Sequence, residues 1–324
     1  MNHRTLYKKV KETISILSDR YQRVVFLRFG IDGQKNTLDA IGKQYKITRE
    51  RVRQILVKAF SDISSSPEKN ILSPAFKWMR EKISGHGGVV AEEWFLETYG
   101  KDKRGALLFA LHLGEEFKRG AGDMRFHHRW FFDEDLHKKA MEELLNLERH
   151  LGKKNVLISS QEVESLLSDI NFVNISKKVL KSALGGYGFS HWPEVLPKNI
   201  KDKSFVVLLK EGKPLHFIEI ANRINTLKLG KKKALRQTVH NELIKDSRFV
   251  LVGRGLYALR DWGFRQGTVR EVIHSLLKEK NRPLDKKELI DLVLKERFVQ
   301  ANTILLNLQG ENIVKLPDGR YMAK

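Results

Sequence analysis

The chain has 324 residues, of which 60 are Lys or Arg and 39 are Asp or Glu, so its formal net charge is +21. An excess of this size indicates a polyanionic partner, most often nucleic acid. The sequence has no cysteine, which excludes disulfides, thiolate zinc sites and a cysteine nucleophile. It has neither a signal-peptide core at its start nor an apolar run of about 18 residues, so we expect a cytoplasmic protein without membrane contact.

The positive charge is concentrated in two blocks. Residues 1–66 and 201–262 each carry a net charge of +8, whereas residues 67–200 carry +1 and residues 263–324 carry +4. This uneven distribution predicts that the polyanion is held by the first and third of these segments. A basic surface that serves solubility alone is the alternative.

The first block has the pattern of short amphipathic helices. An apolar run ends at Gly30 and Gly33, and glycine favours the C-terminal end of a helix. Thr37 is a candidate N-cap for the helix TLDAIGKQY, and Thr48 is one for the helix RERVRQILVKAF. The apolar positions of the second helix form one stripe: Val52, Ile55, Leu56 and Ala59. Two short helices with a short joint form a helix-turn-helix pattern.

The remainder of the chain looks like a weak internal repeat. The stretch SSSPEKN at 64–70 indicates a linker by composition. After it, helical segments begin about 60–68 residues apart, and each unit ends in a short aromatic, β-rich segment. The hairpin pattern is clearest at 248–262 and 312–324.

These patterns predict a mainly α fold with short β-hairpin wings. An N-terminal helix-turn-helix is followed by tandem winged-helix domains. The predicted domains are 1–66 for the helix-turn-helix, and 67–132, 133–200, 201–262 and 263–324 for the winged-helix-like modules.

The helix that follows Thr48 carries candidate base-reading side chains opposite its apolar stripe. They are Arg49, Glu50, Arg53 and Gln54. Arginine can make two hydrogen bonds to guanine and glutamine two to adenine, while glutamate can accept one from the cytosine amino group. The alternative is a solvated helix with internal pairs, since Glu50 and Arg53 are three residues apart.

Other polar side chains of the same segment are candidates to hold phosphates. They are Lys46, Thr48, Arg51 and Lys58. Cationic side chains on phosphates set the register of a protein on DNA without reading sequence. Thr48 and the backbone donors of the helix N-terminus offer one further phosphate contact.

The stretch LSDRYQRVVFLRFGIDGQKNTLDAIGKQYKITRERVRQILVKAF (17–60) resembles region 4 of the bacterial sigma-70 family. The matching motifs are RFGID (28–32), TLDAIGKQY (37–45) and ITRERVRQI (47–55). The resemblance implies that the helix-turn-helix reads the promoter −35 element and docks on the flap of the RNA polymerase β subunit. The family's base-reading positions fall on Arg49, Glu50, Arg53 and Gln54. We find no counterpart of the family's regions 2 and 3.

The segment 203–264 is similar to the HARE-type helix-turn-helix that also occurs in the delta subunit of RNA polymerase. The motifs are KPLHFIEIANRI (213–224), TVHNELIKDSRFV (238–250) and GRGLYALRDWG (253–263). The resemblance implies a role in transcription or in chromatin-like DNA recognition rather than catalysis.

Basic residues open the expected recognition helix of this segment and continue onto its wing. The candidates for phosphate contacts are Lys231, Lys232, Lys233, Arg236 and Arg254, with Arg248 on the strand between them. A solvated lysine run in a loop is the alternative. The apolar residues expected in the core are Phe249, Leu251, Leu256, Tyr257, Leu259 and Trp262.

The sequence predicts no metal, cofactor or catalytic site. His127 and His128 are adjacent, so on a strand they point to opposite faces and one metal could not readily use both. The acidic run at 133–135 indicates the start of a helix.

We therefore expect a sequence-specific DNA-binding transcription factor that is not an enzyme. It would act in transcription initiation on −35-like double-stranded DNA and contact the RNA polymerase core. One alternative is an accessory, delta-like polymerase subunit with weak DNA binding. The other is the DNA-binding part of a restriction or repair system.

Overall fold

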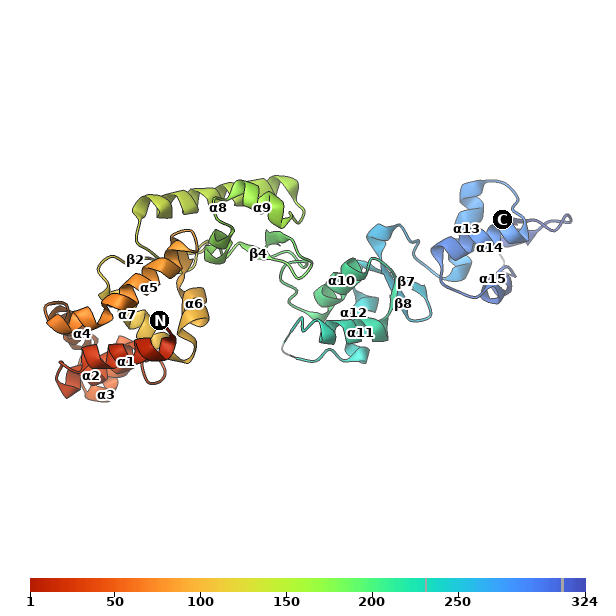
Figure 1. The fold of residues 1–324 in the computed structure, drawn as a ribbon. Helices are drawn as coiled ribbons and strands as arrows, with labels where there is room; N and C mark the ends of the chain where they lie inside the picture. The colour runs from red at the N-terminus through yellow and green to blue at the C-terminus, as the bar shows by residue number, and fades with distance from the viewer. Residues whose placement is uncertain (231, 310–311) are drawn as a thin grey trace. The chain divides into compact units, whose positions relative to one another are not determined.

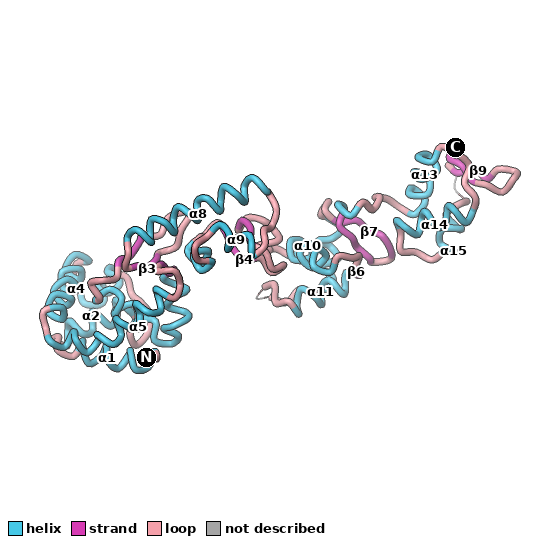
Figure 2. Tube along the Cα trace, turned by 45° about the horizontal axis from the view of Figure 1, so that its top comes forward, coloured by secondary structure: helices cyan, strands magenta, loops and turns pink. Residues whose placement is uncertain are grey.

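The computed structural model describes residues 1–230, 232–309 and 312–324. It divides into two compact units: Met1–Lys181 with Gly186–Ser190, and Ser182–Gly185 with His191–Lys324. Each is mainly helical with short antiparallel strand pairs, which confirms the predicted fold class (Figures 1 and 2). The finer division into five domains stays a prediction.

The first unit begins with four helices that include the expected helix-turn-helix. They are α1 (His3–Ile14), α2 (Asp19–Phe29), α3 (Leu38–Tyr45) and α4 (Arg49–Ser64). Three predicted helix ends are confirmed. Gly30 ends α2 in the left-handed conformation, the Thr37 side chain accepts a hydrogen bond from the Ala40 amide, and the Thr48 side chain accepts one from the Arg51 amide.

The joint between α3 and α4 depends on a close backbone approach. A Cβ atom at Gly42 would lie 2.7 Å from the carbonyl oxygen of Ile47. A small core holds the two helices against α2, and its buried members are Val24, Ile41, Val52 and Ile55. The apolar stripe predicted for α4 is thus on its inner face, with Leu56 half-buried.

The segment that was expected to be a linker is packed instead. Residues Pro67–Leu72 form a 3-10 helix, and Leu72 is fully buried in the same core as Val10 and Ile14. The Lys9 ammonium donates a hydrogen bond to the carbonyl oxygen of Ile71 at 3.1 Å. The stretch 64–70 thus leads into a 3-10 helix that Ile71 and Leu72, just beyond the stretch, tie to α1.

The elements that follow, up to Phe131, form a module of helices and a three-stranded sheet. The elements are α5 (Ser73–Ser84), β1 (Val89–Ala91), α6 (Glu92–Phe95), α7 (Arg104–Leu113), β2 (Lys118–Gly120) and β3 (Arg129–Phe131). The strand order is β1-β3-β2, with both pairings antiparallel.

Helix α7 joins this module to the helix-turn-helix. Its sequence, RGALLFALHL, is almost entirely apolar, and every residue except Arg104 and His112 is buried. A helix that is apolar all round belongs inside a core, and α7 packs against α1 and α2. Residues on both sides of the predicted boundary at 66 therefore share one hydrophobic core.

The first unit continues with a long helix and a two-stranded sheet. Its elements are α8 (Glu134–Lys154), α9 (Ser160–Leu166), β4 (Val179–Lys181) and β5 (Tyr187–Phe189). The side chain of Asp133 accepts hydrogen bonds from the amides of Asp135 and Leu136, so the acidic run begins α8 as predicted.

The second unit contains two sets of helices, each followed by a hairpin. The first set is α10 (Ile200–Glu211), β6 (Leu215–His216), α11 (Phe217–Thr226), α12 (Arg236–Lys245), β7 (Phe249–Gly253) and β8 (Leu256–Leu259). The second set is α13 (Val269–Lys280), α14 (Lys286–Glu296), α15 (Ala301–Asn307), β9 (Ile313–Lys315) and β10 (Tyr321–Ala323). Both predicted hairpins are confirmed.

The core predicted for the first of these hairpins is correct except at one position. Phe249, Tyr257 and Leu259 are buried, and Leu256 and Trp262 are half-buried. Leu251 is 52% exposed. By alternation it shares a face with Phe249, which is buried in the main core of this module, whereas Val250 and Val252 point to the opposite face and are buried in a second small core with Ala258.

The contact between α7 and the turn after α2 predicts the effect of a single methyl group. In Gly105→Ala the new Cβ would meet the carbonyl oxygen of Gly30 and lie 2.6 Å from that of Phe29. These are backbone atoms, so relief requires the two segments to separate. We expect a loss of stability of roughly 1–3 kcal/mol, measured by urea unfolding of the full chain.

Gly152→Ala is the matched control, because Gly152 lies in α8 and a Cβ there has nothing within 4 Å. Alanine is favoured over glycine in a helix interior, so this variant should gain up to about 1 kcal/mol. If Gly105→Ala lost no stability relative to the unmodified chain, the close approach of α7 to α2 would not be as described.

Candidate nucleic-acid interface

The four side chains predicted to read bases all lie on the solvent side of α4. The exposed fractions of the side chains are 69% for Arg49 and 58% for both Glu50 and Arg53, and Gln54 is also exposed. Their positions follow from the packing of α4, because the helical period that buries Val52 turns these residues away from the core. They are thus available to a ligand.

Two hydrogen-bonded pairs connect neighbouring side chains on this face of α4. The guanidinium of Arg53 donates to both carboxylate oxygens of Glu50 at 2.8–3.1 Å, and Arg51 donates to the Gln54 amide oxygen at 3.1 Å. The hydrogen bonds from Arg53 lower the pKa of Glu50, and Glu50 raises the pKa of Arg53. Exposed pairs of this kind contribute little to stability, so they can be exchanged for contacts to DNA.

Arg49 lies on this face, and the residues predicted to contact phosphates lie beside it. Arg49 lies 3.9 Å from the carboxylate of Asp39 on α3, and Lys58 forms an ion pair of 2.7 Å with Asp62 one turn along α4. Lys46 is exposed at the end of α3 in the left-handed conformation, with φ at 53°. The structure therefore gathers the candidates of the first block on α4 and on the turn before it.

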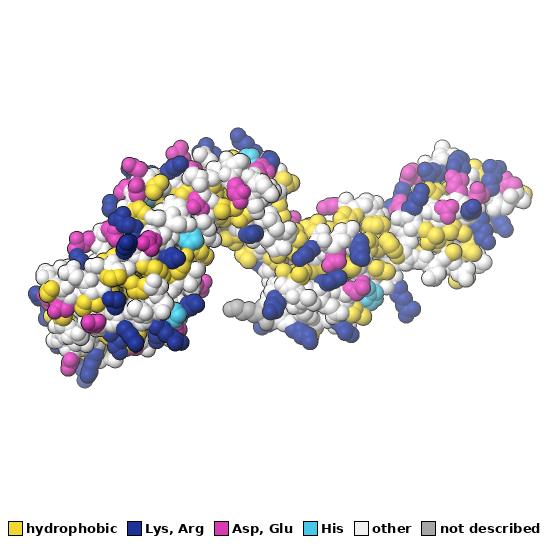
Figure 3. Space-filling view, in the orientation of Figure 1, with side chains coloured by type: hydrophobic (Ala, Val, Ile, Leu, Met, Phe, Trp, Pro, Cys, Tyr) yellow, Lys and Arg dark blue, Asp and Glu magenta, His cyan; other side chains and the backbone are white. Residues whose placement is uncertain are grey.

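The second group of predicted residues lies in the other unit. Lys232 and Lys233 are exposed in the loop before α12, Arg236 is the first residue of α12, and Arg254 is exposed in the turn between β7 and β8. Lys231 lies outside the described residues. Figure 3 shows Lys and Arg side chains along the edge of the module that holds α11 and α12.

Asn225 of α11 holds Ala234, the residue that follows Lys233. The Asn225 side chain accepts a hydrogen bond from the Ala234 amide at 2.7 Å and donates one to the Ala234 carbonyl oxygen at 3.0 Å. These two hydrogen bonds pin the loop immediately before α12. Lys233 and Arg236 therefore lie on either side of an anchored residue.

Arg248, which directly precedes β7, is held by carboxylates of its own module. Its guanidinium is bound by Asp246 at 2.7 Å and by Asp202 at 3.1 Å, and it is only half-exposed. The hydrogen bond from Arg248 lowers the pKa of Asp246. With both carboxylates engaged, Arg248 connects the start of α10 to the start of β7.

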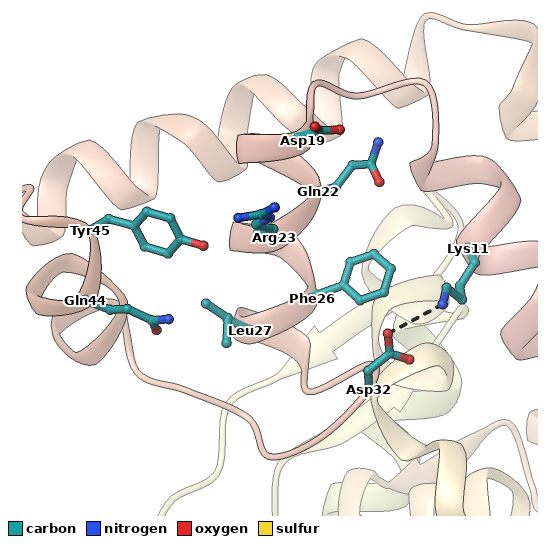
Figure 4. Close-up of a pocket in the computed structure, with 9 residues that line it drawn as sticks. All are labelled: Lys11, Asp19, Gln22, Arg23, Phe26, Leu27, Asp32, Gln44 and Tyr45. Carbon is teal, nitrogen blue, oxygen red and sulfur yellow. Dashed lines mark ion pairs between the residues drawn. The ribbon is translucent and has the colours of Figure 1, made fainter.

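A groove of about 660 Å³ lies between α1, α2 and α3 (Figure 4). Phe26 and Leu27 of α2 form its apolar part, and the Lys11 ammonium lies 5.6 Å from the centre of the Phe26 ring. Lys11 also lies 3.6 Å from Asp32, an ion pair that spans one end of the groove. The mixture of apolar surface with charges of both signs suits a protein segment better than a polyanion.

The residues that the structure describes contain no cluster of three or more His, Asp or Glu arranged to hold a metal ion. Among the described helices, none is both long and apolar enough to cross a membrane.

Both resemblances found in the sequence are confirmed by comparison with known families. Residues 13–64 match the family described as Sigma-70, region 4. Residues 199–262 match the HARE-HTH family, whose description names a restriction endonuclease HTH domain.

Two sigma factors are similar to part of this chain. The RNA polymerase sigma factor SigA of Lactococcus lactis subsp. cremoris is 43% identical over 63 residues, which are 19% of this chain and 17% of that protein. SigA of Lactococcus lactis subsp. lactis strain IL1403 is also 43% identical over 63 residues, or 16% of its length. The chain thus covers about one sixth of these relatives. It carries two helix-turn-helix domains whose families indicate a DNA-binding role linked to transcription.

Proposed function

We propose that this protein binds promoter DNA in a sequence-specific manner during transcription initiation, with α4 reading a −35-like element. The observation that carries the proposal is the exposure of Arg49, Glu50, Arg53 and Gln54 on one face of α4, inside the sigma-70 region 4 match. A binding role is preferred to an enzymatic one because both matched families are DNA-binding types.

In the bound state the pairs within α4 would open and their groups would turn to base edges. Arg53 can donate two hydrogen bonds to a guanine, and Gln54 can both donate and accept at an adenine. Lys46, Arg51 and Lys58 would hold phosphates on either side, which sets the register of α4 in the major groove. DNA thereby replaces hydrogen bonds that the free protein makes internally.

The HARE-type domain would add a second, less selective contact. Lys232, Lys233 and Arg236 are exposed at the start of α12, and no ion pair engages them among the described residues. Exposed cations without an ion pair suit a phosphate backbone. Two weak modules on one chain strengthen each other through effective concentration.

Arg53→Ala tests base reading directly. Loss of one bidentate base contact should weaken binding to the preferred duplex about 5- to 150-fold and relax the preference at one base pair. The measurement is a competition assay with the preferred duplex and its single-base variants. Arg20→Ala removes the same charge from an exposed position on α2 and is the matched control.

Base reading by Arg53 would be contradicted by an equal loss on all sequences. A loss of that kind would assign the arginine to phosphate contact alone.

Lys232→Ala tests the contribution of the HARE-type domain. It should weaken binding uniformly across sequences and reduce the slope of log affinity against log salt by about one unit. Lys138→Ala, which removes an exposed lysine from α8, should leave the slope unchanged. A slope unaltered by Lys232→Ala would place that lysine among solvated surface charges.

Contact with RNA polymerase is the second part of the proposal. The resemblance to sigma region 4 supports this partner, and the groove between α1, α2 and α3 offers a surface for a polymerase segment. An accessory subunit that touches DNA only weakly would use the same surface.

Phe26→Ala should reduce capture of polymerase core by the full chain about tenfold, since a half-buried aromatic side chain supplies much of the apolar area of the groove. Binding of the variant to duplex DNA should be unchanged. Capture of core without any sequence-selective DNA binding would favour the accessory subunit, and undiminished capture by the variant would exclude the groove.

A further inference from the structure

A second cleft lies where α4 meets α2 and α7, and it has a volume of about 380 Å³. Three cationic side chains line it: Arg28 of α2, Lys35 of the turn that follows, and Arg53 of α4. No carboxylate is among the described residues that line the cleft. Its electrostatic character is therefore that of a site for an anion.

The floor of the cleft is apolar and aromatic. The rings of Phe29 and Phe60 lie 5.7 Å apart, and the ring of His112 packs edge-on against Phe29 at 5.2 Å. His112 is held by a hydrogen bond of 2.8 Å between Nδ1 and the carbonyl oxygen of Leu108. Val57 is 58% exposed at this site, although it lies on an otherwise polar side of α4.

One side chain of the cleft floor, His112, comes from outside the sigma-type domain. His112 belongs to α7, whereas the match to sigma-70 region 4 covers residues 13–64. This side chain is positioned by the packing of α7 against α2, where Gly105 lies directly against Gly30. The cleft is therefore a feature of this chain's combination of modules.

Two of the three cations in the cleft have no ion pair in the part of the chain that the structure describes, whereas Arg53 is paired with Glu50. Neither Arg28 nor Lys35 has an ion pair among the described residues, and Arg28 donates only to the carbonyl oxygen of Asn36. Desolvation lowers the pKa of Lys35. The positive charges of Arg28 and Arg119 lower this pKa further, and the negative charge of Glu92 opposes the shift. Of the two carboxylates that act on Lys35, Glu92 and Glu93, the first already accepts two hydrogen bonds from Arg119 at 2.5 and 2.9 Å and one from Trp130 at 3.0 Å.

We propose that this cleft binds a free anionic ligand of the nucleotide class, with its phosphates on Arg28 and Lys35 and its planar base against the rings of Phe60 and His112, which pack over the buried Phe29. A phosphate of duplex DNA alone would leave the aromatic floor uncovered. A ligand with both an anionic and a planar part satisfies both halves of the cleft, as small-molecule sites typically require.

The occupant would also alter DNA reading, an inference that rests on the proposed function. Arg53 lines the cleft and is one of the four base-reading candidates. An anion in the cleft competes with the DNA base for this guanidinium, so the nucleotide should weaken selective DNA binding. By linkage, the preferred duplex should weaken nucleotide binding by the same factor.

Calorimetric titration of the full chain with ATP and with inorganic triphosphate tests the site. Both are used without divalent metal and at constant ionic strength. ATP should bind more tightly than triphosphate, because only ATP covers the aromatic floor. Lys35→Gln should weaken ATP binding about tenfold or more, the loss expected for one charged hydrogen bond.

Lys43→Gln, at an exposed position on α3 outside the cleft, is the matched control and should bind ATP normally. Val57→Glu places a carboxylate at the exposed edge of the cleft without disturbing the core, and it should abolish ATP binding. Absence of ATP binding, equal affinity for triphosphate, or equal losses in Lys35→Gln and Lys43→Gln would each overturn the proposal.

A final arm separates this inference from the proposed function. Selective duplex binding is measured with and without ATP, with triphosphate as the charge-matched control. Selective binding that ATP does not weaken more than triphosphate does would overturn the coupling and leave the proposed function intact. Absence of selective DNA binding at any ATP concentration would contradict the proposed function, while the calorimetric arms still decide whether the cleft binds nucleotide.

Discussion

The burial of one face of α4 is the constraint on which the account of this protein depends. Val52, Ile55 and Ala59 pack inward, and the period of the helix then turns Arg49, Glu50, Arg53 and Gln54 to solvent. Rotation of α4 about its axis by one residue would bury charged side chains, which would cost a large part of the free energy of folding. The same apolar contacts that stabilise the fold therefore determine which side chains can meet DNA.

The position of α4 is determined in turn by residues outside the helix-turn-helix. Ala59 and Ile63 of α4 belong to the core that contains Leu107 and Phe109 of α7, so the exposed face of α4 rests on a larger base. A larger rigid base lowers the conformational entropy lost on binding. It also creates the cleft beside Arg53 that we propose to bind a nucleotide.

Features determined by neighbouring residues could be predicted from the sequence. Thr37, Thr48 and Asp133 were expected to begin helices and do so through hydrogen bonds to amides within three residues. The two hairpins of the second unit and the exposure of the four α4 side chains were predicted for the same reason. Periodicity and capping are local, so one sequence suffices to read them.

Features that depend on distant residues were missed. The stretch at 64–70 has the composition of a linker, yet Leu72 just beyond it is buried because α1 offers it a place. Leu251 has the type of a core residue, yet it is exposed on the strand face that carries the buried Phe249. Arg28 and Lys35 carry no local signal of a site, because the cleft they line needs His112, which is far away in sequence. The apolar run ALLFAL in α7 does indicate a buried helix, but it does not indicate which helices cover it.

Selection of preferred duplexes from a random pool, carried out with the purified full chain, tests the central claim most directly. If the outward face of α4 reads base edges, repeated selection should converge on one short motif, and it should do so whether or not polymerase core is present. If the recovered pool stays random while the chain still retains DNA, the exposed face of α4 holds only the phosphate backbone and the account is wrong.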